Sequence, residues 1–162
     1  MSFYGNYFLT TSYAADHIKN KLGPQNIKIT SSDLTLKTRS DIFYSGLHNA
    51  IDILEKNQKK VILTVDIPEL PFFPRDCYRN DKNCQLMKNE VKSRQLELRA
   101  LIAKLKQQHP SLLIFDPIQI FCPNELCIFQ DSKQILYRDS HHLTLRGSDI
   151  YAKYFINWLN IH

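Results

Sequence analysis

The spacing of hydrophobic and polar residues predicts two successive units, each a helix followed by a buried strand. Apolar positions at helical spacing predict an amphipathic helix over residues 40–56, with Ser40 as its N-cap. The β-branched, almost continuously apolar run at 61–67 predicts a strand buried on both faces. A second helical stripe covers residues 87–105, and residues 112–116 repeat the strand pattern. Two such units favour an α/β fold with a layered parallel sheet over a helical bundle or a β-sandwich.

The two ends of the chain show other patterns. Residues 127–137 indicate two short strands around a polar Gln-Asp-Ser-Lys turn, and residues 150–159 carry a last apolar helical stripe. The first forty residues are less regular, and they could hold a strand at 3–9, a helix at 13–22 and an edge strand at 27–29. The pattern shows no repeats and no linker, so we expect one domain, or a large piece of one, over residues 1–162.

Composition and charge narrow the class of protein. A chain of 162 residues with 43% hydrophobic content can bury one substantial core. The net charge of +5 comes from 21 basic and 16 acidic residues that are scattered along the chain, without the basic and aromatic pattern of a nucleic-acid-binding protein. No apolar run is long enough to span a bilayer, and the first residues lack the features of a signal peptide. An export signal would therefore lie outside this chain.

The four cysteines form two local pairs in polar, proline-containing segments. Cys77 stands seven residues before Cys84, and Cys122 stands five residues before Cys127. Two short disulfide loops suit this arrangement, and a zinc site of four thiolates is the alternative, although Cys77 and Cys84 are spaced too widely for a zinc knuckle. Disulfides would place the chain in an oxidising compartment such as a periplasm.

The segment between the hairpin and the last helix carries the candidate chemistry. Asp139 precedes His142 by three residues in a turn, so the carboxylate and the imidazole can project toward one cleft. In acyl transfer an imidazole takes a proton from a hydroxyl nucleophile, and a carboxylate orients it. Leu143 would anchor the turn in the core, Thr144 can cap the following helix, and Gly147 permits a close approach of that helix to the sheet.

This segment resembles a block of the SGNH hydrolases. Residues 139–144 (Asp-Ser-His-His-Leu-Thr), followed by Gly147, match the pattern Asp-x-x-His-Leu-Ser/Thr. The strand that ends in Asp116-Pro117, the pair Cys122 and Cys127, and the hairpin before Asp139 are similar to the SGNH domain at the C-terminus of bacterial membrane acyltransferases of acyltransferase family 3. Those enzymes O-acylate surface polysaccharides. The resemblance covers roughly residues 40 to 160.

The resemblance implies a three-layer, flavodoxin-like α/β sandwich with a parallel sheet, and a serine acyltransferase or esterase acting on acyl esters, above all O-acetyl groups of an envelope polysaccharide. By that likeness His142 is the general base and Asp139 orients it, whereas His141 has no catalytic role. The expected partners are an acyl donor, a polysaccharide acceptor and a membrane acyltransferase module upstream in the same polypeptide. The domain would then be periplasmic and tethered to the inner membrane, without a metal or an organic cofactor.

The chain departs from the family pattern in its nucleophile. The family's domains open with a strand and a Gly-Asp-Ser segment, and this chain has no Gly-Asp-Ser; its one Gly-Ser pair is Gly147-Ser148. We expect an N-terminally truncated domain whose serine lies outside this chain, and no esterase activity from these residues alone. Asn6, in the Gly-Asn pair after Phe3-Tyr4, is a candidate oxyanion-hole donor, although Gly-Asn is also an ordinary turn pair.

Two other interpretations remain open. The chain could be a non-catalytic remnant that binds a polysaccharide or a partner, with Asp139 merely capping the last helix. It could also be a metal-dependent phosphoesterase built around Asp139, His141 and His142, although the other histidines show no companion motif: His17, His48, His109 and His162. Finally, the apolar loop at 71–74, after the first buried strand, could border an acyl pocket.

Overall fold

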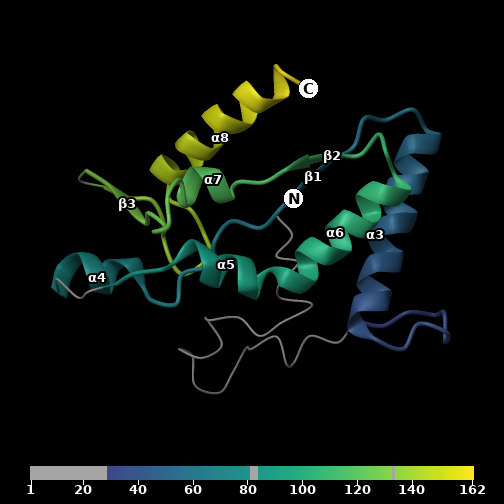
Figure 1. Ribbon diagram of the computed structural model, residues 1–162, viewed down its shortest axis with the longest axis horizontal. Coiled ribbons are helices and arrows are strands. Elements are labelled where there is room, and N and C mark those ends of the chain that lie inside the picture. Colours follow the sequence, from purple (N-terminus) through teal and green to yellow (C-terminus); the bar gives the residue numbers. More distant parts are fainter. Residues whose placement is uncertain (1–28, 81–83, 133) are drawn as a thin grey trace. The chain divides into compact units, whose positions relative to one another are not determined.

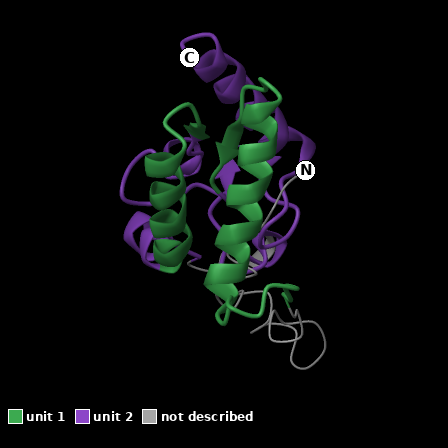
Figure 2. Cartoon of the chain, turned by 90° about the vertical axis from the view of Figure 1, so that its right-hand side faces the viewer, with its two compact units in different colours: residues 1–65, 94–114 green, residues 66–93, 115–162 purple. Residues whose placement is uncertain are grey.

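The computed structural model describes residues 29–80, 84–132 and 134–162 (Figure 1). The strand and the helix expected at 3–9 and 13–22 lie outside these ranges, as does most of the edge strand expected at 27–29. The chain divides into two compact units, one of residues 1–65 and 94–114 and the other of residues 66–93 and 115–162 (Figure 2). We call them unit 1 and unit 2. The expectation of a single domain over residues 1–162 stays a prediction.

Unit 1 contains the two predicted helix and strand pairs, except for Phe115, the last residue of the second strand, which belongs to unit 2. Helix α3 (Arg39–Lys56) precedes strand β1 (Ile62–Thr64), and helix α6 (Leu96–Gln108) precedes strand β2 (Leu113–Phe115). The two strands pair in a small parallel sheet, where Leu113 N donates to Val61 O at 3.0 Å. The α/β alternation is confirmed, but both strands are shorter than the apolar runs at 61–67 and 112–116. The three-layer sandwich stays a prediction, since two short strands do not define the layers.

Helix α3 begins one residue earlier than expected, and its cap is Thr38 rather than Ser40. The Thr38 hydroxyl accepts from Asp41 N at 3.0 Å, and the Asp41 carboxylate accepts from Thr38 N at 3.3 Å. This reciprocal capping box satisfies two N–H groups at once, whereas a cap at Ser40 would satisfy one. The prediction of Ser40 as N-cap was therefore wrong.

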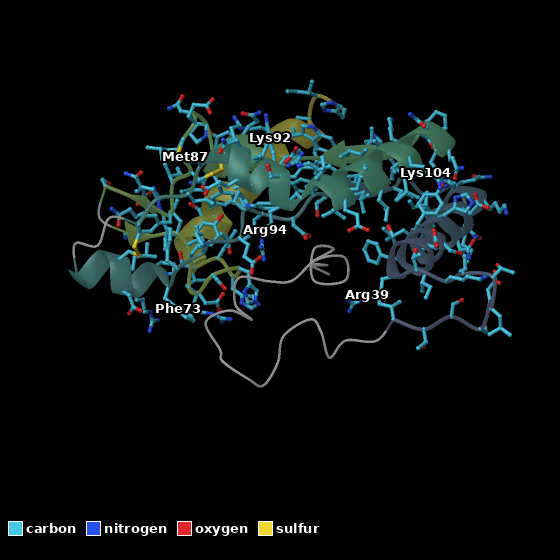
Figure 3. All side chains as sticks on the ribbon, turned by 60° about the horizontal axis from the view of Figure 1, so that its bottom comes forward. Arg39, Phe73, Met87, Lys92, Arg94 and Lys104 are labelled. Carbon is cyan, nitrogen blue, oxygen red and sulfur yellow. A yellow bond between two sulfur atoms is a disulfide. The ribbon has the colours of Figure 1, made fainter. Side chains whose placement is uncertain are left out.

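The core of unit 1 lies between α3, α6 and the small sheet. Helix α6 runs alongside α3 (Figure 1). Lys104, which is labelled in Figure 3, belongs to α6. Its Nζ lies 4.1 Å from the centre of the Tyr44 ring in α3. The apolar side chains that these elements share are Phe43, Leu47, Ile51, Val61, Leu63, Leu98, Leu101, Ile102, Leu105, Leu112 and Ile114.

The second helical stripe is interrupted, which the apolar spacing did not show. Residues 87–105 form helix α5 (Lys88–Arg94) and the start of α6, with a break at Gln95. The Gln95 backbone leaves helical geometry at φ −91° and ψ 8°, and its buried side-chain oxygen accepts from Arg99 Nη2 at 2.8 Å. A glutamine has no intrinsic tendency to break a helix, so the sequence gives no warning of the break.

Unit 2 holds several short elements, the last helix and both disulfides. It contains α4 (Pro74–Asn80), α7 (Ile118–Phe121), the strands β3 (Gln130–Asp131) and β4 (Gln134–Ile135), and α8 (Leu145–Leu159). Strands β3 and β4 pair antiparallel, so a hairpin is confirmed, but Gln130 and Asp131, which were expected in its turn, form β3 instead. Both predicted disulfides are confirmed as well, with Cα separations of 5.9 Å for Cys77–Cys84 and 3.9 Å for Cys122–Cys127. A zinc site of four thiolates is thereby excluded.

The last helix, α8, is fixed to unit 2 by its N-terminus and by aromatic packing. Thr144 is its N-cap, as predicted, and accepts from Gly147 N at 3.2 Å. A Cβ atom at Gly147 would overlap the Leu136 carbonyl oxygen, so the predicted close approach is confirmed. Phe115 packs edge-on against three rings of α8, those of Tyr151, Phe155 and Trp158. Among the described helices, none is both long and apolar enough to cross a membrane.

Candidate active site

The turn between β4 and α8 holds the predicted site. Backbone bonds close this turn on itself, since Arg138 N donates to His142 O at 2.7 Å and Tyr137 bridges to Leu143. Tyr137 is 1% exposed and packs edge-on against Phe121, which anchors one side of the turn in the core of unit 2. Tyr137 and Leu143 therefore hold the two ends of the turn together, and residues 138–142 lie between them.

Within this turn the structure brings Asp139 and His142 into direct contact. His142 Nδ1 lies 2.9 Å from Asp139 Oδ1 and 2.8 Å from Oδ2. The Asp139 carboxylate also accepts from the backbone N–H groups of His141, at 3.0 Å, and His142, at 2.8 Å. A carboxylate accepts only, so His142 Nδ1 carries the proton and donates it. The basic nitrogen of the neutral ring is then Nε2, as a catalytic triad requires.

The local electrostatics keep Asp139 ionised. Burial raises the pKa of Asp139, but hydrogen bonds from the His141 backbone and from the side chain and backbone of His142 outweigh it, so the pKa is lowered overall. A carboxylate that stays charged can hold the imidazole in one tautomer and stabilise its protonated form. The His142 side chain is 45% exposed, which leaves the ring accessible to a reacting group.

His141 differs from His142 in its surroundings. Its Nδ1 lies 2.9 Å from the hydroxyl of Ser140, and its ring stands 4.2 Å from the His142 ring. Burial lowers the pKa of His141, the charge of His142 lowers it further, and Asp139 and Glu69 oppose both effects. Ser140 itself is 2% exposed, and its carbonyl accepts from Leu70 N at 2.8 Å. Ser140 is thus inaccessible as a nucleophile, and His141 is the more structural of the two histidines.

A pocket of about 710 Å³ borders the turn in unit 2. Its charged lining consists of Arg75, Arg138 and Arg146, and Ile135, Leu143 and Leu145 add apolar groups. Two of the guanidinium groups are already paired, Arg138 with Asp139 at 3.5 Å and Arg146 with Asp131 at 2.8 Å. Neither Asp139 nor His142 lines this pocket, but residues on both sides of them in sequence do, and its arginines can interact with a polar or anionic ligand.

The same turn could in principle hold a metal ion, because ligand atoms of Asp139, His141 and His142 lie within 4.8 Å of one another. The hydrogen bonds argue against it. Three N–H groups already donate to Asp139 Oδ1, and His141 Nδ1 contacts the Ser140 hydroxyl. Coordination would have to break bonds that shape the turn, whereas orienting His142 uses them.

Other sequence predictions fare differently. Asn6 lies outside the described residues, so the oxyanion-hole prediction is untested. In the loop at 71–74, Phe72 packs edge-on against Phe129 and Pro74 is fully buried, whereas Phe73 is 39% exposed. Sequence reasoning missed Arg75 and Arg146 as pocket residues, because arginines in polar segments carry no distinguishing pattern. It also missed a second histidine and carboxylate cluster in unit 1, around His48 and His109.

Comparison with known families decides what the Asp139 turn belongs to. The family model described as "SGNH domain (fused to AT3 domains)" matches residues 4–157. The chain belongs to this SGNH family. No curated protein and no solved structure matches the chain. The SGNH family implies an α/β hydrolase-like fold and a domain of the acyltransferase or esterase type.

The family and the disulfides agree on the setting of this SGNH domain. Fusion to AT3 domains, in the family description, points to a membrane acyltransferase module in the full-length protein. The two disulfides fit an extracytoplasmic domain, because thiols stay reduced in the cytosol. The resemblance of residues 139–144 to the SGNH block is thus confirmed at the level of the family.

Proposed function

We propose that this chain is the C-terminal part of an SGNH acyltransferase or esterase domain that uses a serine, histidine and aspartate triad. His142 is the general base and Asp139 its orienting carboxylate. The observation that supports this proposal is the pair of bonds from His142 Nδ1 to Asp139, at 2.9 and 2.8 Å, on a half-exposed imidazole. The nucleophilic serine comes from a Gly-Asp-Ser segment outside this chain.

We propose the following sequence of steps for the reaction. His142 Nε2 removes the proton from the serine hydroxyl as the oxygen attacks the carbonyl carbon of the acyl donor. The resulting imidazolium is stabilised by the ionised Asp139 carboxylate, 2.8 Å from the ring. Collapse of the tetrahedral intermediate transfers the proton from Nε2 to the leaving group and leaves an acyl-serine. A sugar hydroxyl or water then attacks this ester while His142 takes its proton, and the acyl–serine bond breaks as His142 returns that proton to the serine oxygen. Asn6 would donate to the oxyanion.

The substrates and the location belong to the same proposal. The acyl group, most simply acetyl, arrives through a membrane acyltransferase module in the same polypeptide. The acceptor is a hydroxyl of an envelope polysaccharide, and the pocket lined by Arg75, Arg138 and Arg146, which includes residues of the same turn, would receive polar groups of that polymer. The domain then works in the periplasm, tethered to the inner membrane.

The test compares this chain with a longer polypeptide that contains the upstream Gly-Asp-Ser segment. We expect the longer polypeptide to release acetate from an O-acetylated sugar and to react covalently with a fluorophosphonate, a reagent for activated serines. The 162-residue chain alone should do neither. Polysaccharide binding without turnover by the longer polypeptide would instead indicate a binding module, and phosphoester turnover that EDTA abolishes would indicate a metal-dependent phosphoesterase.

A further inference from the structure

The histidine and carboxylate cluster of unit 1 lies far along the chain from the Asp139 turn, and nothing in the proposed acyl transfer uses it. His48 and Asp52 stand four residues apart on α3, so they share one helix face. His109 is the C-cap of α6 and is 3% exposed. All three residues belong to unit 1, and their ligand atoms lie within 4.8 Å of one another.

We propose that His48, Asp52 and His109 bind a zinc ion. Two imidazoles and one carboxylate are a common protein ligand set for zinc, and a water molecule completes the tetrahedron. Imidazole nitrogens select zinc, copper or nickel over magnesium and calcium, which prefer oxygen ligands. Thiolates do not compete for the ion, because all four cysteines of the chain are in disulfides.

The two ring nitrogens already face one another. His48 Nδ1 lies 2.8 Å from His109 Nε2, and the ring centres are 4.8 Å apart. A tetrahedral zinc with bonds of about 2.0–2.1 Å separates its ligand nitrogens by roughly 3.3 Å. A shift of a few tenths of an ångström would therefore open this contact for the ion. Zinc would take the place of the proton that the two nitrogens now share.

The buried histidine is also oriented as a zinc ligand requires. His109 Nδ1 lies 2.7 Å from Glu55 Oε2, and the Ser111 hydroxyl donates to the other oxygen of the same carboxylate. This bond places the proton of His109 on Nδ1, so the lone pair of Nε2 points toward His48 and Asp52. Zinc-binding histidines usually donate their second N–H to a carboxylate in this way, which fixes the ring and increases its basicity.

The third ligand can reach the ion at low cost. Asp52 now pairs with Lys56 at 3.1 Å, in an i,i+4 contact whose side chains are 40% and 75% exposed. Such a contact between exposed groups is weak. Asp52 can therefore rotate toward the two imidazoles. The bound ion would join α3 to the end of α6 just before β2 and would stabilise unit 1 in proportion to the zinc concentration.

The test is a zinc titration of the full chain after EDTA treatment and dialysis, with calorimetry as the measurement of zinc binding. We expect one equivalent of zinc bound at this cluster, a melting temperature that rises with zinc, and no comparable response to magnesium. His48→Gln and Asp52→Asn should each weaken binding at least tenfold. Glu55→Gln, which removes only the partner of His109, should weaken it by about tenfold. His48 and Asp52 are partly exposed, so these variants should fold, which circular dichroism would verify.

His142→Gln is the matched control, because it removes a histidine from the other cluster that could hold a metal. Its zinc affinity should stay within twofold of the parent chain. The proposal is overturned if the parent chain binds no zinc, if His48→Gln and Asp52→Asn bind as the parent does, or if His142→Gln alone abolishes binding.

Discussion

Within the described parts of the chain, each compact unit contains one cluster of histidines and carboxylates, and the two clusters are built in opposite ways. In unit 2, Asp139, His141 and His142 lie on four consecutive residues of one turn, and the ring of His142 is half-exposed. In unit 1, His48 and Glu55 of α3 contact His109. His48 is 61 residues and Glu55 is 54 residues away from His109 in sequence, and His109 is 3% exposed. The first cluster presents a base to its surroundings, whereas the second connects α3 to the end of α6 through one buried ring, that of His109.

The difference shows what each carboxylate does. Asp139 is held by backbone N–H groups and orients an accessible ring, which suits proton transfer. Glu55 is held by Ser111 and orients a buried ring, which suits packing or metal binding. Removing the first carboxylate should therefore affect the reaction, and disrupting the second cluster should affect the stability of unit 1.

The largest expected effect concerns turnover. In the longer polypeptide with the serine, Asp139→Asn should reduce kcat/KM for an acyl ester by about three to four powers of ten, because the amide would favour the wrong tautomer of His142. Asp149→Asn is the matched control, because it makes the same change at an exposed residue of α8, and it should leave kcat/KM within twofold. A large loss in Glu55→Gln, with none in Asp139→Asn, would reverse the roles of the two clusters.

The second effect concerns stability. His109→Ala should lower the free energy of unfolding by about 2–3 kcal/mol, because it leaves a cavity and removes two hydrogen bonds from a buried ring. His141→Ala, in the other cluster, should cost about 1 kcal/mol or less, since that ring is 18% exposed and contacts the Ser140 hydroxyl of the same turn. Urea denaturation measures both. Equal losses would mean that the two clusters contribute alike to stability.

Two glycines sharpen the contrast between the units in a similar way. Gly147→Ala should destabilise the protein by about 1–3 kcal/mol, because the new methyl group would collide with the Leu136 carbonyl in unit 2. Gly46→Ala, in α3 of unit 1, meets nothing within 4 Å and should stabilise the protein by about 0.5–1 kcal/mol. Thermal denaturation would show shifts of opposite sign, and shifts of the same sign would contradict the close approach at Gly147.

The smallest effect is a dependence on pH. The pKa of Asp139 is lowered by folding, so its contribution to stability is fully present above the unfolded value near 3.8 and is lost as the pH falls through the lower folded value. Between pH 5 and pH 2.5, Asp139→Asn should therefore lose less stability than the parent chain does. Urea midpoints at several pH values measure this difference. If stability fell with pH in the same way in both proteins, the hydrogen bonds of Asp139 would contribute no stability that depends on its charge.

The sequence was informative wherever the interactions are local. The Asp139 turn, the hairpin, the Thr144 cap and both disulfides each join residues only a few positions apart, so their spacing could be read directly. The α/β alternation followed from the periodicity of the apolar residues. The strand lengths and the break at Gln95 did not, because tertiary packing decides them.

The His48 and His109 cluster illustrates why the rest escaped prediction. The i,i+4 spacing of His48 and Asp52 was visible, but such a pair is common on helix surfaces. Its significance depends on the packing of α3 against α6, which brings in His109 from a distant segment. Likewise Thr38 and Ser40 were both suitable N-cap residues for α3 in the sequence. Only the backbone geometry shows that Thr38 is the cap.

The most direct test of the central claim is the turnover of His142→Gln in the longer polypeptide that carries the serine, measured as kcat/KM for an acetyl ester. His142 is half-exposed, so the variant should keep the fold, which circular dichroism would verify. We predict a loss of at least three powers of ten, together with loss of fluorophosphonate labelling of the serine. A folded variant whose kcat/KM stays within fivefold of the parent would show that His142 is not the base.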